Sequence, residues 1–422
     1  MSSRLLCMSA ALLGVLLCCA SAQTSKVIVL EHADSLIGLV VDGQDARELS
    51  GHVRIRQENV IIQCDQALQF IVSGKVHLAG HVVAYDDSMT MTAPRGLYDR
   101  DTRHVEAYEQ VTLDDGVSHL EAEFGAYDVD PRVALFRSHV TARDTASVLF
   151  ADTLRYERTR KLMHATGNVR VFHPQDGITI TGGDLVHDGL ARYSRVTVFP
   201  VLVKYDTASG GIIDTLIVTA RVMESFQDSV RRLRATDSVS FVRSDLAGRA
   251  GAILFYTAGD SLELRHAPIL WYQETQVTGD SINVYLIKRA LDRIVVMGSA
   301  FAISRGDSLR PERFDQLAGE TLKMQFHERA LHQIDVDVRA LSVYHLYDDS
   351  LANGLNKTSG DRIIMQFADG RAKTIRVVGG VEGQYFPEPM VRRREREYRL
   401  PGFLWRDERP RLRIPTEKVT VP

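Results

Sequence analysis

Apolar and polar residues alternate along most of this chain, and the alternation recurs at a fixed spacing. Side chains in a β-strand alternate between two faces, so the apolar runs point to one side of a sheet, whereas residues such as Arg54 and Thr112 point to the other. The pattern therefore predicts a tandem β-repeat. Five valines lie 29 residues apart, and each opens such a run: Val53, Val82, Val111, Val140 and Val169.

Further apolar positions recur in phase with these valines, before and after a polar turn in each repeat. We expect about three strands per repeat around one shared apolar interior. A unit of this size cannot bury its own apolar face, so neighbouring repeats must stack into an elongated body. The positions expected to face the interior, and to contact an apolar ligand held there, are Val53, Ile55, Val60, Ile62, Val82, Met89, Met91, Val111, Leu113, Leu120, Val140, Leu149, Val169, Val171, Ile178 and Ile180.

A second signature marks the repeats. It consists of a small residue, then usually an acid, one variable position and an aliphatic residue, and it is followed later by a small residue, a variable residue and a valine. It occurs as ADSL at 33–36, before Val53, and as ADTL at 151–154, before Val169. Looser copies in the second half are 40 and 41 residues apart, which indicates the same unit with longer loops. These copies begin at Gly279, Gly319 and Gly360.

The signatures divide the chain into successive parts. We expect a repeat region with the 29-residue period at 23–188, a second repeat region with longer loops at 189–390 and an arginine-rich tail at 391–422. Residues 189–234 are the least regular, and VMESFQDSVRRLRA, at 222–235, is the best candidate for a helix. The predicted fold class is all-β, as an elongated jellyroll of stacked strands or, alternatively, a closed β-solenoid.

The first 22 residues have the form of a secretory signal, with basic Arg4, an apolar run from Leu5 to Leu17 and a small-residue ending before Gln23. We therefore expect an exported protein. Cleavage there leaves Cys64 as the remaining cysteine, so we expect no disulfide within the monomer and a small apolar filler at Cys64. The chain is slightly acidic, with a formal net charge of −3, and we expect no nucleic-acid partner.

Catalysis, metal binding and a cofactor are not expected. GDSL occurs at 259–262 and 306–309, a string that opens the nucleophile block of one esterase family, but the accompanying Asp-x-x-His would have to follow it, and Asp184–His187 precedes both copies. Three histidines share one outward position in different repeats, which favours exposed polar residues over a metal site. These histidines are His52, His81 and His139.

The tail has two interpretations. Between 392 and 413 it holds nine arginines and four acids. One interpretation is a solvated, partly disordered end, as is usual for a charged run. The other is a surface that contacts anionic phosphates or an acidic partner, since arginine binds phosphate in bidentate fashion.

Several stretches resemble a known family. ADSLIGLVVDGQDARELSGHVRIRQENVIIQCDQALQF, AGHVVAYDDSMTMTAPRGLYD and ATGNVRVFHPQDGITITGGDLVHD are similar to OstA-like proteins, the periplasmic lipopolysaccharide-export proteins of the LptA type, and the resemblance extends over roughly 27–390. It implies a periplasmic location, where the protein can associate with the outer membrane. It also implies a twisted, partly open β-jellyroll whose interior holds lipid A acyl chains. It also implies partners: lipopolysaccharide, other export proteins at the inner and outer membranes, and end-to-end self-association.

The residues alone leave a different function open. A closed, dry core without a ligand produces the same apolar columns, and in that case the chain is a structural envelope scaffold or adhesin. The family resemblance is what favours lipid transport over this alternative.

Overall fold

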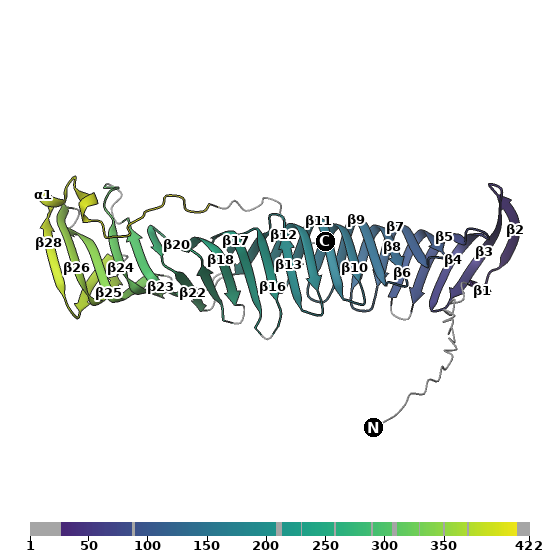
Figure 1. Ribbon diagram of the computed structural model, residues 1–422, viewed down its shortest axis with the longest axis horizontal. Helices are drawn as coiled ribbons and strands as arrows, with labels where there is room; N and C mark the ends of the chain where they lie inside the picture. The colour runs from purple at the N-terminus through teal and green to yellow at the C-terminus, as the bar shows by residue number, and fades with distance from the viewer. Residues whose placement is uncertain are drawn as a thin grey trace, which may run out of the picture.

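The computed structural model describes residues 27–86, 89–207, 213–228, 230–256, 259–287, 290–305, 310–328, 330–348, 351–368 and 371–411. The expected signal at 1–22 and the end of the tail lie outside these ranges. Within them the chain forms one antiparallel sheet of 28 strands, so the all-β prediction is confirmed. The strands cross an elongated body, whose two ends are formed by the first and the last strands (Figure 1).

The strands of the N-terminal part are β1 (Val29–His32), β2 (Ser35–Val41), β3 (Gln44–Gln57), β4 (Val60–Phe70), β5 (Lys75–Asp86), β6 (Met89–Asp99), β7 (His104–Asp114), β8 (His119–Asp128), β9 (Val133–Arg143), β10 (Val148–Glu157), β11 (Leu162–His173), β12 (Ile178–Asp188), β13 (Tyr193–Thr197) and β14 (Val201–Thr207). Those of the C-terminal part are β15 (Ile213–Thr219), β16 (Val222–Phe226), β17 (Arg232–Val242), β18 (Leu246–Tyr256), β19 (Ser261–Arg265), β20 (Ile269–Tyr272), β21 (Thr275–Thr278), β22 (Ser281–Ile287), β23 (Ala290–Ser304), β24 (Asp315–His327), β25 (Ala330–Asp348), β26 (Leu351–Ala368), β27 (Arg371–Val378) and β28 (Glu382–Pro387). Two short helices follow, α1 (Glu388–Val391) and the 3₁₀ helix η1 (Glu395–Tyr398).

Each 29-residue repeat supplies two long strands, and the expectation of about three is wrong. β5 and β6 form one repeat, for example, and each strand pairs with the next in antiparallel fashion. A closed solenoid of parallel coils is therefore not formed. In the second half the added length lies largely in the strands: β25 has 19 residues and β26 has 18, whereas β7 has 11.

The long strands bend at their middle, where a bulge interrupts the pairing. In β5 the register shifts between Ala79 and Val82, and the two residues between them, Gly80 and His81, have φ angles of +74° and +45°. A β-bulge bends its strand, so a row of bulges folds the sheet lengthwise along a crease. The crease divides the folded sheet into two walls. We call the wall that contains the residues of β5 after the crease, from Val82, the A wall. The wall that contains the residues of β5 before the crease, from Lys75, is the B wall.

Asp34 and Asp152 of the acid-containing signature each lie against the glycine of a bulge, Gly51 and Gly167, and Asp65 occupies the same place at this crease. The Asp65 carboxylate lies against Gly80 so closely that a Cβ atom there would be 2.3 Å from Oδ2, and it pairs with His81 Nδ1 at 2.8 Å. Only glycine fits both the contact and the positive φ. The other two histidines of the outward column occupy the same position: His52 pairs with Asp34 and His139 with Glu123. These histidines therefore hold bulges in place.

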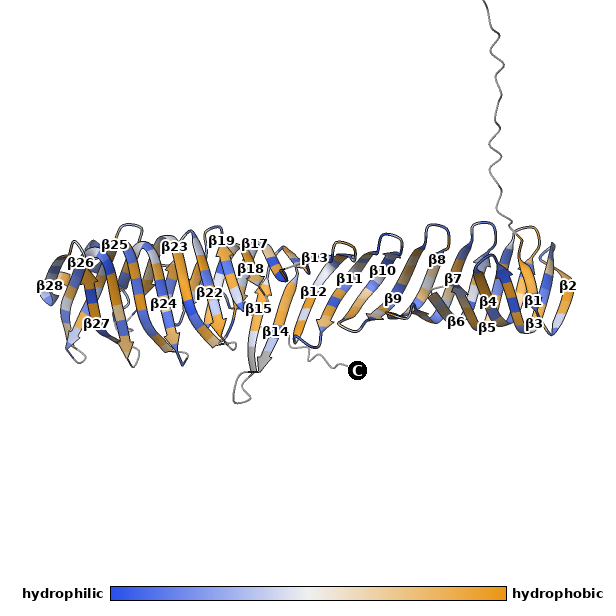
Figure 2. Ribbon diagram, turned by 90° about the horizontal axis from the view of Figure 1, so that it is seen from below, coloured by the Kyte–Doolittle hydropathy of each residue, from blue (hydrophilic) through white to orange (hydrophobic). Residues whose placement is uncertain are grey.

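The apolar faces of both walls form the core. One cluster of buried side chains runs from Leu49 to Val196, a second runs from Ile178 to Met365, and Ile180 packs against both. Apolar and polar residues alternate along the strands in Figure 2, as the period of two predicts. The candidate helix at 222–235 is wrong: its ends form β16 and the start of β17, where Met223 and Ala235 pair side by side and are both buried.

Residues 388–411 form a segment that we call the C-terminal strap. It runs back over the outer face of the sheet, along the strands of the C-terminal part (Figure 1). Its side chains Val391, Tyr398 and Leu400 belong to one buried cluster with outward-facing Phe301 and Ile303. The first interpretation of the tail, a solvated end, is therefore wrong for these residues.

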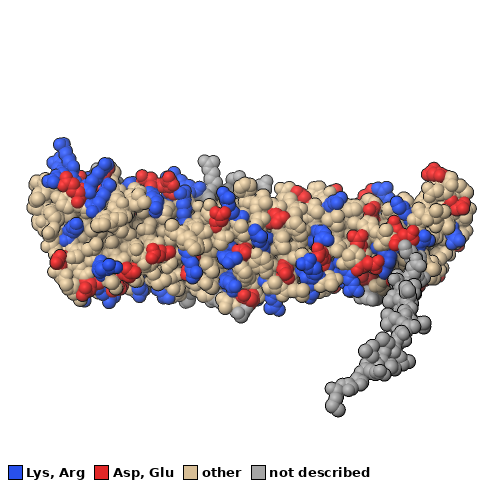
Figure 3. All heavy atoms as spheres, viewed as in Figure 1, with Lys and Arg blue, Asp and Glu red and all other residues tan. Residues whose placement is uncertain are grey.

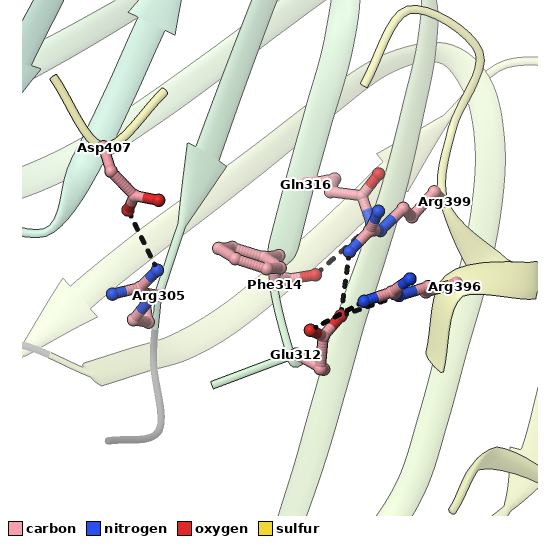
Figure 4. A network of polar contacts seen from close by, with 7 residues as sticks. All are labelled: Arg305, Glu312, Phe314, Gln316, Arg396, Arg399 and Asp407. Atoms are coloured by element: carbon pink, nitrogen blue, oxygen red, sulfur yellow. Dashed lines mark hydrogen bonds and ion pairs between the residues drawn. The ribbon is translucent and has the colours of Figure 1, made fainter. Parts of the chain in front are cut away.

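Polar contacts hold the strap along its length. Glu312 receives Arg396 and Arg399, each at 3.1 Å, and these guanidinium groups, Arg396 above all, keep the pKa of the carboxyl below its usual range. Arg305 reaches Asp407 at 3.4 Å, and Figure 4 shows both sets of contacts. The strap is a third layer, bound by ion pairs as well as by an apolar face.

Candidate functional site

The interior between the two walls is the candidate site. The structure places all sixteen positions predicted from the sequence on strands or at strand ends, and all of them are buried except Val171 and Ile180, which are half-buried. Those two lie where the two core clusters meet, and Ile180 contacts both. The positions are thus brought together along one continuous apolar interior.

The two walls are in contact across the interior. Val60, Met89 and Met91 of the A wall line a small cavity together with Val105 and Tyr127 of the B wall. This cavity has a volume of about 20 Å³, which is room for about one water molecule. The interior is therefore packed here, and an acyl chain could enter only if the walls moved apart.

Polar side chains close the edge opposite the crease, where the turns of the two walls meet. The Tyr98 hydroxyl of the B wall donates to Gln57 Oε1 of the A wall at 2.5 Å, and Gln57 Nε2 donates to the Arg100 carbonyl at 3.4 Å. Tyr98 and Gln57 are both buried, and burial raises the pKa of Tyr98 to about 12. A buried hydrogen bond of this kind is costly to break because both partners are desolvated.

Two arginines span the same edge. Arg103 lies 3.1 Å from Glu58 and donates to Asn59 at 3.2 Å, which joins a B-wall turn to an A-wall turn. Arg158, from another B-wall turn, lies 3.4 Å from Asp86 of the A wall. We call the contacts of Gln57, Tyr98, Arg103 and Arg158 the seam. The sequence alone did not reveal them, since their partners are 41 to 72 residues apart.

The role of the seam can be tested through the reactivity of the buried cysteine, Cys64. Burial raises the pKa of the Cys64 thiol to about 11, so it should react very slowly with alkylating agents in the folded protein. A Tyr98→Phe variant leaves Gln57 Oε1 without its donor, at a cost of about 1–3 kcal/mol, and we expect alkylation of Cys64 to become roughly ten- to a hundredfold faster. The measurement is the rate of labelling under native conditions.

Tyr108→Phe is the matched control for the seam variant. The Tyr108 hydroxyl donates to Glu106 of its own strand, on the outer face, so its loss opens nothing. The rate of Cys64 labelling should then stay close to that of the unaltered protein. Equal rates in the two variants would show that Tyr98 does not hold the walls together.

Among the residues that the structure describes, nothing caps either end of the interior. In the pairing register, Leu30 and Leu36 lie beside the buried residues Ile55 and Leu49, yet they are themselves exposed. At the other end, Ile375 lies beside buried Met365 and is also exposed. Within the described residues β2 pairs with β3 alone, and β27 and β28 each pair with β26 alone, so both ends present unpaired strand edges.

Ser261 of the first GDSL string opens β19 and pairs with Tyr285 in the sheet, whereas the second string, at 306–309, lies outside the described residues. Within the described ranges, no three side chains of His, Cys, Asp or Glu come together as a metal site. No helix in the described part of the chain has the length and apolar character needed to cross a membrane.

Comparison with known proteins agrees with the resemblance. The family model described as OstA-like protein matches residues 25–138 and residues 74–164, and these two matches together span about a third of the 422 residues. No curated protein was found that matches the chain. A crystal structure of LptH, the LptA-homologous periplasmic component of the lipopolysaccharide transport device of Pseudomonas aeruginosa, is 12% identical, with 34% of this chain and 95% of that chain covered and a TM-score of 0.27.

Proposed function

We propose that this chain, whose residues 25–164 match the family model of OstA-like proteins, binds lipopolysaccharide in the periplasm and forms part of a bridge that carries it to the outer membrane. The apolar interior is the binding site in this proposal, and lipid A acyl chains are its ligand. The observation that carries the proposal is the continuity of the inward columns, from exposed Leu30 and Leu36 at one end to exposed Ile375 at the other.

The energetics of lipid transfer favour such an interior. An acyl chain of about a dozen carbons costs on the order of 10 kcal/mol to expose to water, at about 0.8 kcal/mol per methylene. A carrier must therefore offer apolar contact along the whole path. Met89 and Met91 lie beside the small cavity near the seam, and methionine adapts its shape to irregular partners. We propose that lipid enters where the seam opens and the walls part.

The uncapped ends support a role in a bridge. Unpaired strand edges accept a further strand from another protein, and exposed apolar side chains beside them add contact area. We propose that β2 at one end and β27 and β28 at the other join other export proteins or further copies of this chain. The inward columns would then continue from one protein to the next.

A structural scaffold without a ligand is the second candidate. The close packing of the interior favours it, because Val111, Ala134 and Ala165 are fully buried and the cavity beside Met91 is very small. In that case the columns serve only to stabilise the fold.

Photocrosslinking in cells tests the proposal and separates the two candidates. A photoreactive amino acid is placed at Ile62, Met91 or Leu120, which are buried in the interior, and adducts are detected by blotting for lipopolysaccharide. Arg54 and Thr112, on the outer face, are the controls. We expect adducts from the inward positions alone. Equal labelling of both sets, or no adduct in folded protein, would contradict lipid binding and favour the scaffold.

A further inference from the structure

The C-terminal strap is held on the sheet without adding a strand to it. Among the described residues β28 is the last strand, and the backbone–backbone hydrogen bonds of the strap join its own residues, such as Phe403 N–H to the Leu400 carbonyl at 3.1 Å. The strap could therefore leave its place without breaking any ladder of the sheet. We call the outer surface of β18–β24 that it covers the strap site.

Two buried glutamines bind the backbone of the strap. Gln276 of β21 and Gln316 of β24 are 1% and 3% exposed, and the strand register places them in one row across the sheet. Gln276 Nε2 donates to the Leu404 carbonyl and its Oε1 accepts from the Arg406 N–H, both at 2.8 Å. Gln316 Oε1 accepts from the Leu400 N–H, also at 2.8 Å. Side-chain amides both donate and accept, so this row can fix a peptide backbone that crosses the strands.

Aromatic contacts determine which side chains fit the strap site. The centroid of the Phe314 ring lies 5.3 Å from that of Phe403 and 5.1 Å from that of Trp405. The Arg305 guanidinium lies 4.9 Å from the centroid of the Trp405 ring, which is a cation–π contact. The site therefore recognises two aromatic side chains of the strap as well as its backbone.

Ion pairs of both polarities add a pattern of charge. Arg249 and Arg305 of the sheet pair with Glu408 and Asp407 of the strap, at 3.0 Å and 3.4 Å. In the opposite sense, Glu312 pairs with two arginines of the strap. Basic and acidic side chains lie close together at this end of the body in Figure 3. The strap of a second copy carries the same side chains in the same order and would match this pattern equally well.

A short connection with an unfavourable backbone conformation leads into the strap. α1 ends at Val391 and η1 begins at Glu395, so residues 392–394 join them. Among these, Arg393 has a φ of +68°, which residues with a Cβ atom rarely adopt because the Cβ crowds the following carbonyl oxygen. Short hinges under strain favour exchange of the segment that follows them, since the strain is released when the hinge opens toward a second copy.

We propose that residues 395–411 exchange between two copies of this chain, so that each copy's strap occupies the strap site of the other. Exchange of identical elements forms dimers at low cost, because every contact is replaced by its equivalent. A tethered strap meets its own site at an effective concentration of about a millimolar, so the exchanged pair becomes abundant as the protein approaches that concentration. The strap lies on the outer face, and the inference does not depend on lipid in the interior.

Photocrosslinking between isotopically distinct copies tests the exchange. A photoreactive amino acid replaces Leu404, whose side chain is 55% exposed, in the exported chain beginning at Gln23. Copies with natural and with heavy nitrogen are mixed at about millimolar concentration and equilibrated, then irradiated, digested and examined by mass spectrometry. We expect adducts that join a strap peptide of one isotope to a peptide of the other isotope that contains Gln276.

Adducts within the same isotope alone would overturn the proposal, because every strap would then lie on its own sheet. End-to-end joining of copies does not produce mixed adducts of this kind. The strap and the strap site both lie at the C-terminal end of the body, which in such a chain of copies meets the N-terminal end of the next copy (Figure 1). The result is therefore independent of the bridge proposed above.

Gln276→Leu/Gln316→Leu removes the contacts to the strap backbone and keeps the buried volume. Mixed adducts should fall at least about tenfold, because three buried hydrogen bonds are lost. Gln63→Leu is the control, since Gln63 lies on the outer face of β4, far from the strap. Mixed adducts that persist in the double variant would show that the strap site does not bind the exchanged strap.

Arg393→Gly tests the hinge, because glycine adopts a positive φ without strain. The closed monomer then becomes more stable relative to the exchanged pair, and mixed adducts should fall at least about fivefold. Arg392→Gly is the matched control: it removes the same charge from the adjacent residue, whose φ of −56° any residue can adopt. Equal losses in the two glycine variants would contradict a role of hinge strain in the exchange.

Discussion

A Val111→Asp variant is expected to lose most of the stability of the N-terminal repeats. Val111 is 0% exposed, in the main apolar cluster, and its Cγ1 lies against Gly125 of the neighbouring strand. A carboxylate there would have no partner, and an uncompensated buried charge costs several kcal/mol. Since a typical domain is stable by only about 5–15 kcal/mol, this loss is a large fraction of the total. Urea denaturation followed by circular dichroism measures it.

Val117→Asp is the matched control for this substitution. Val117 lies in the turn between β7 and β8, only six positions along the chain, and is 74% exposed. Its replacement should change the free energy of unfolding by no more than about 0.5 kcal/mol. Two equally stable variants would mean that water reaches Val111, so the interior would be a hydrated channel and the proposal of an apolar path for acyl chains would fail.

The inward columns could be predicted from the sequence because two periods agree on them. Alternation assigns each side chain to a face, and the 29-residue spacing repeats the assignment in every unit, so an error in one repeat is corrected by the next. The same logic held in β12, where Ile178 and Ile180 follow a connection lengthened by two residues.

The number of strands per repeat could not be predicted because, in a sequence, a bulge within a strand resembles a turn between two strands. Along β5, Val76 and Leu78 face the interior before the crease, and Val82 and Ala84 face it after the crease. At the bulge Gly80 and His81 oppose the single residue Pro94, and the column of inward apolar side chains is interrupted there, which in a sequence reads as the end of one strand and the start of another. The crease signal was visible nonetheless in the acid-containing signature.

The seam was hidden for a different reason. Tyr98 and Gln57 are polar and lie in separate repeats, and each alone is typical of a solvated strand end. Their contact depends on the stagger of the strands, by which a B-wall turn meets the A-wall turn of an earlier repeat. No local pattern encodes that stagger.

The sequence contains a sign that the sheet is covered by the strap, although the many arginines of the tail drew attention away from it. Phe301 and Ile303 alternate with Ala300 and Ala302, so both faces of this part of β23 are apolar. Apolar residues on both faces indicate a strand covered on both sides. The covering element is the strap itself, whose arginines point away or pair with acids while its apolar side chains cover the sheet.

Replacing Leu400 with alanine is expected to lower the free energy of unfolding by about 2–5 kcal/mol, the usual range for a buried leucine. Leu400 is 3% exposed, packs in the cluster that holds Phe301 and Ile303, and its backbone N–H donates to Gln316 Oε1 at 2.8 Å. The backbone contact is retained in the variant, so the loss reports the apolar packing of the strap. Urea denaturation measures it.

Leu404→Ala makes the same chemical change four residues along the strap, where the side chain is 55% exposed, and should cost no more than about 0.5 kcal/mol. A large loss at Leu400 alone would establish the strap as a third layer of the C-terminal part. Two small and equal losses would mean that the strap lies on the sheet without stabilising it. The ion pairs of Glu312 with Arg396 and Arg399 would then be the main contacts that hold it, and because they are exposed they should weaken as salt is added.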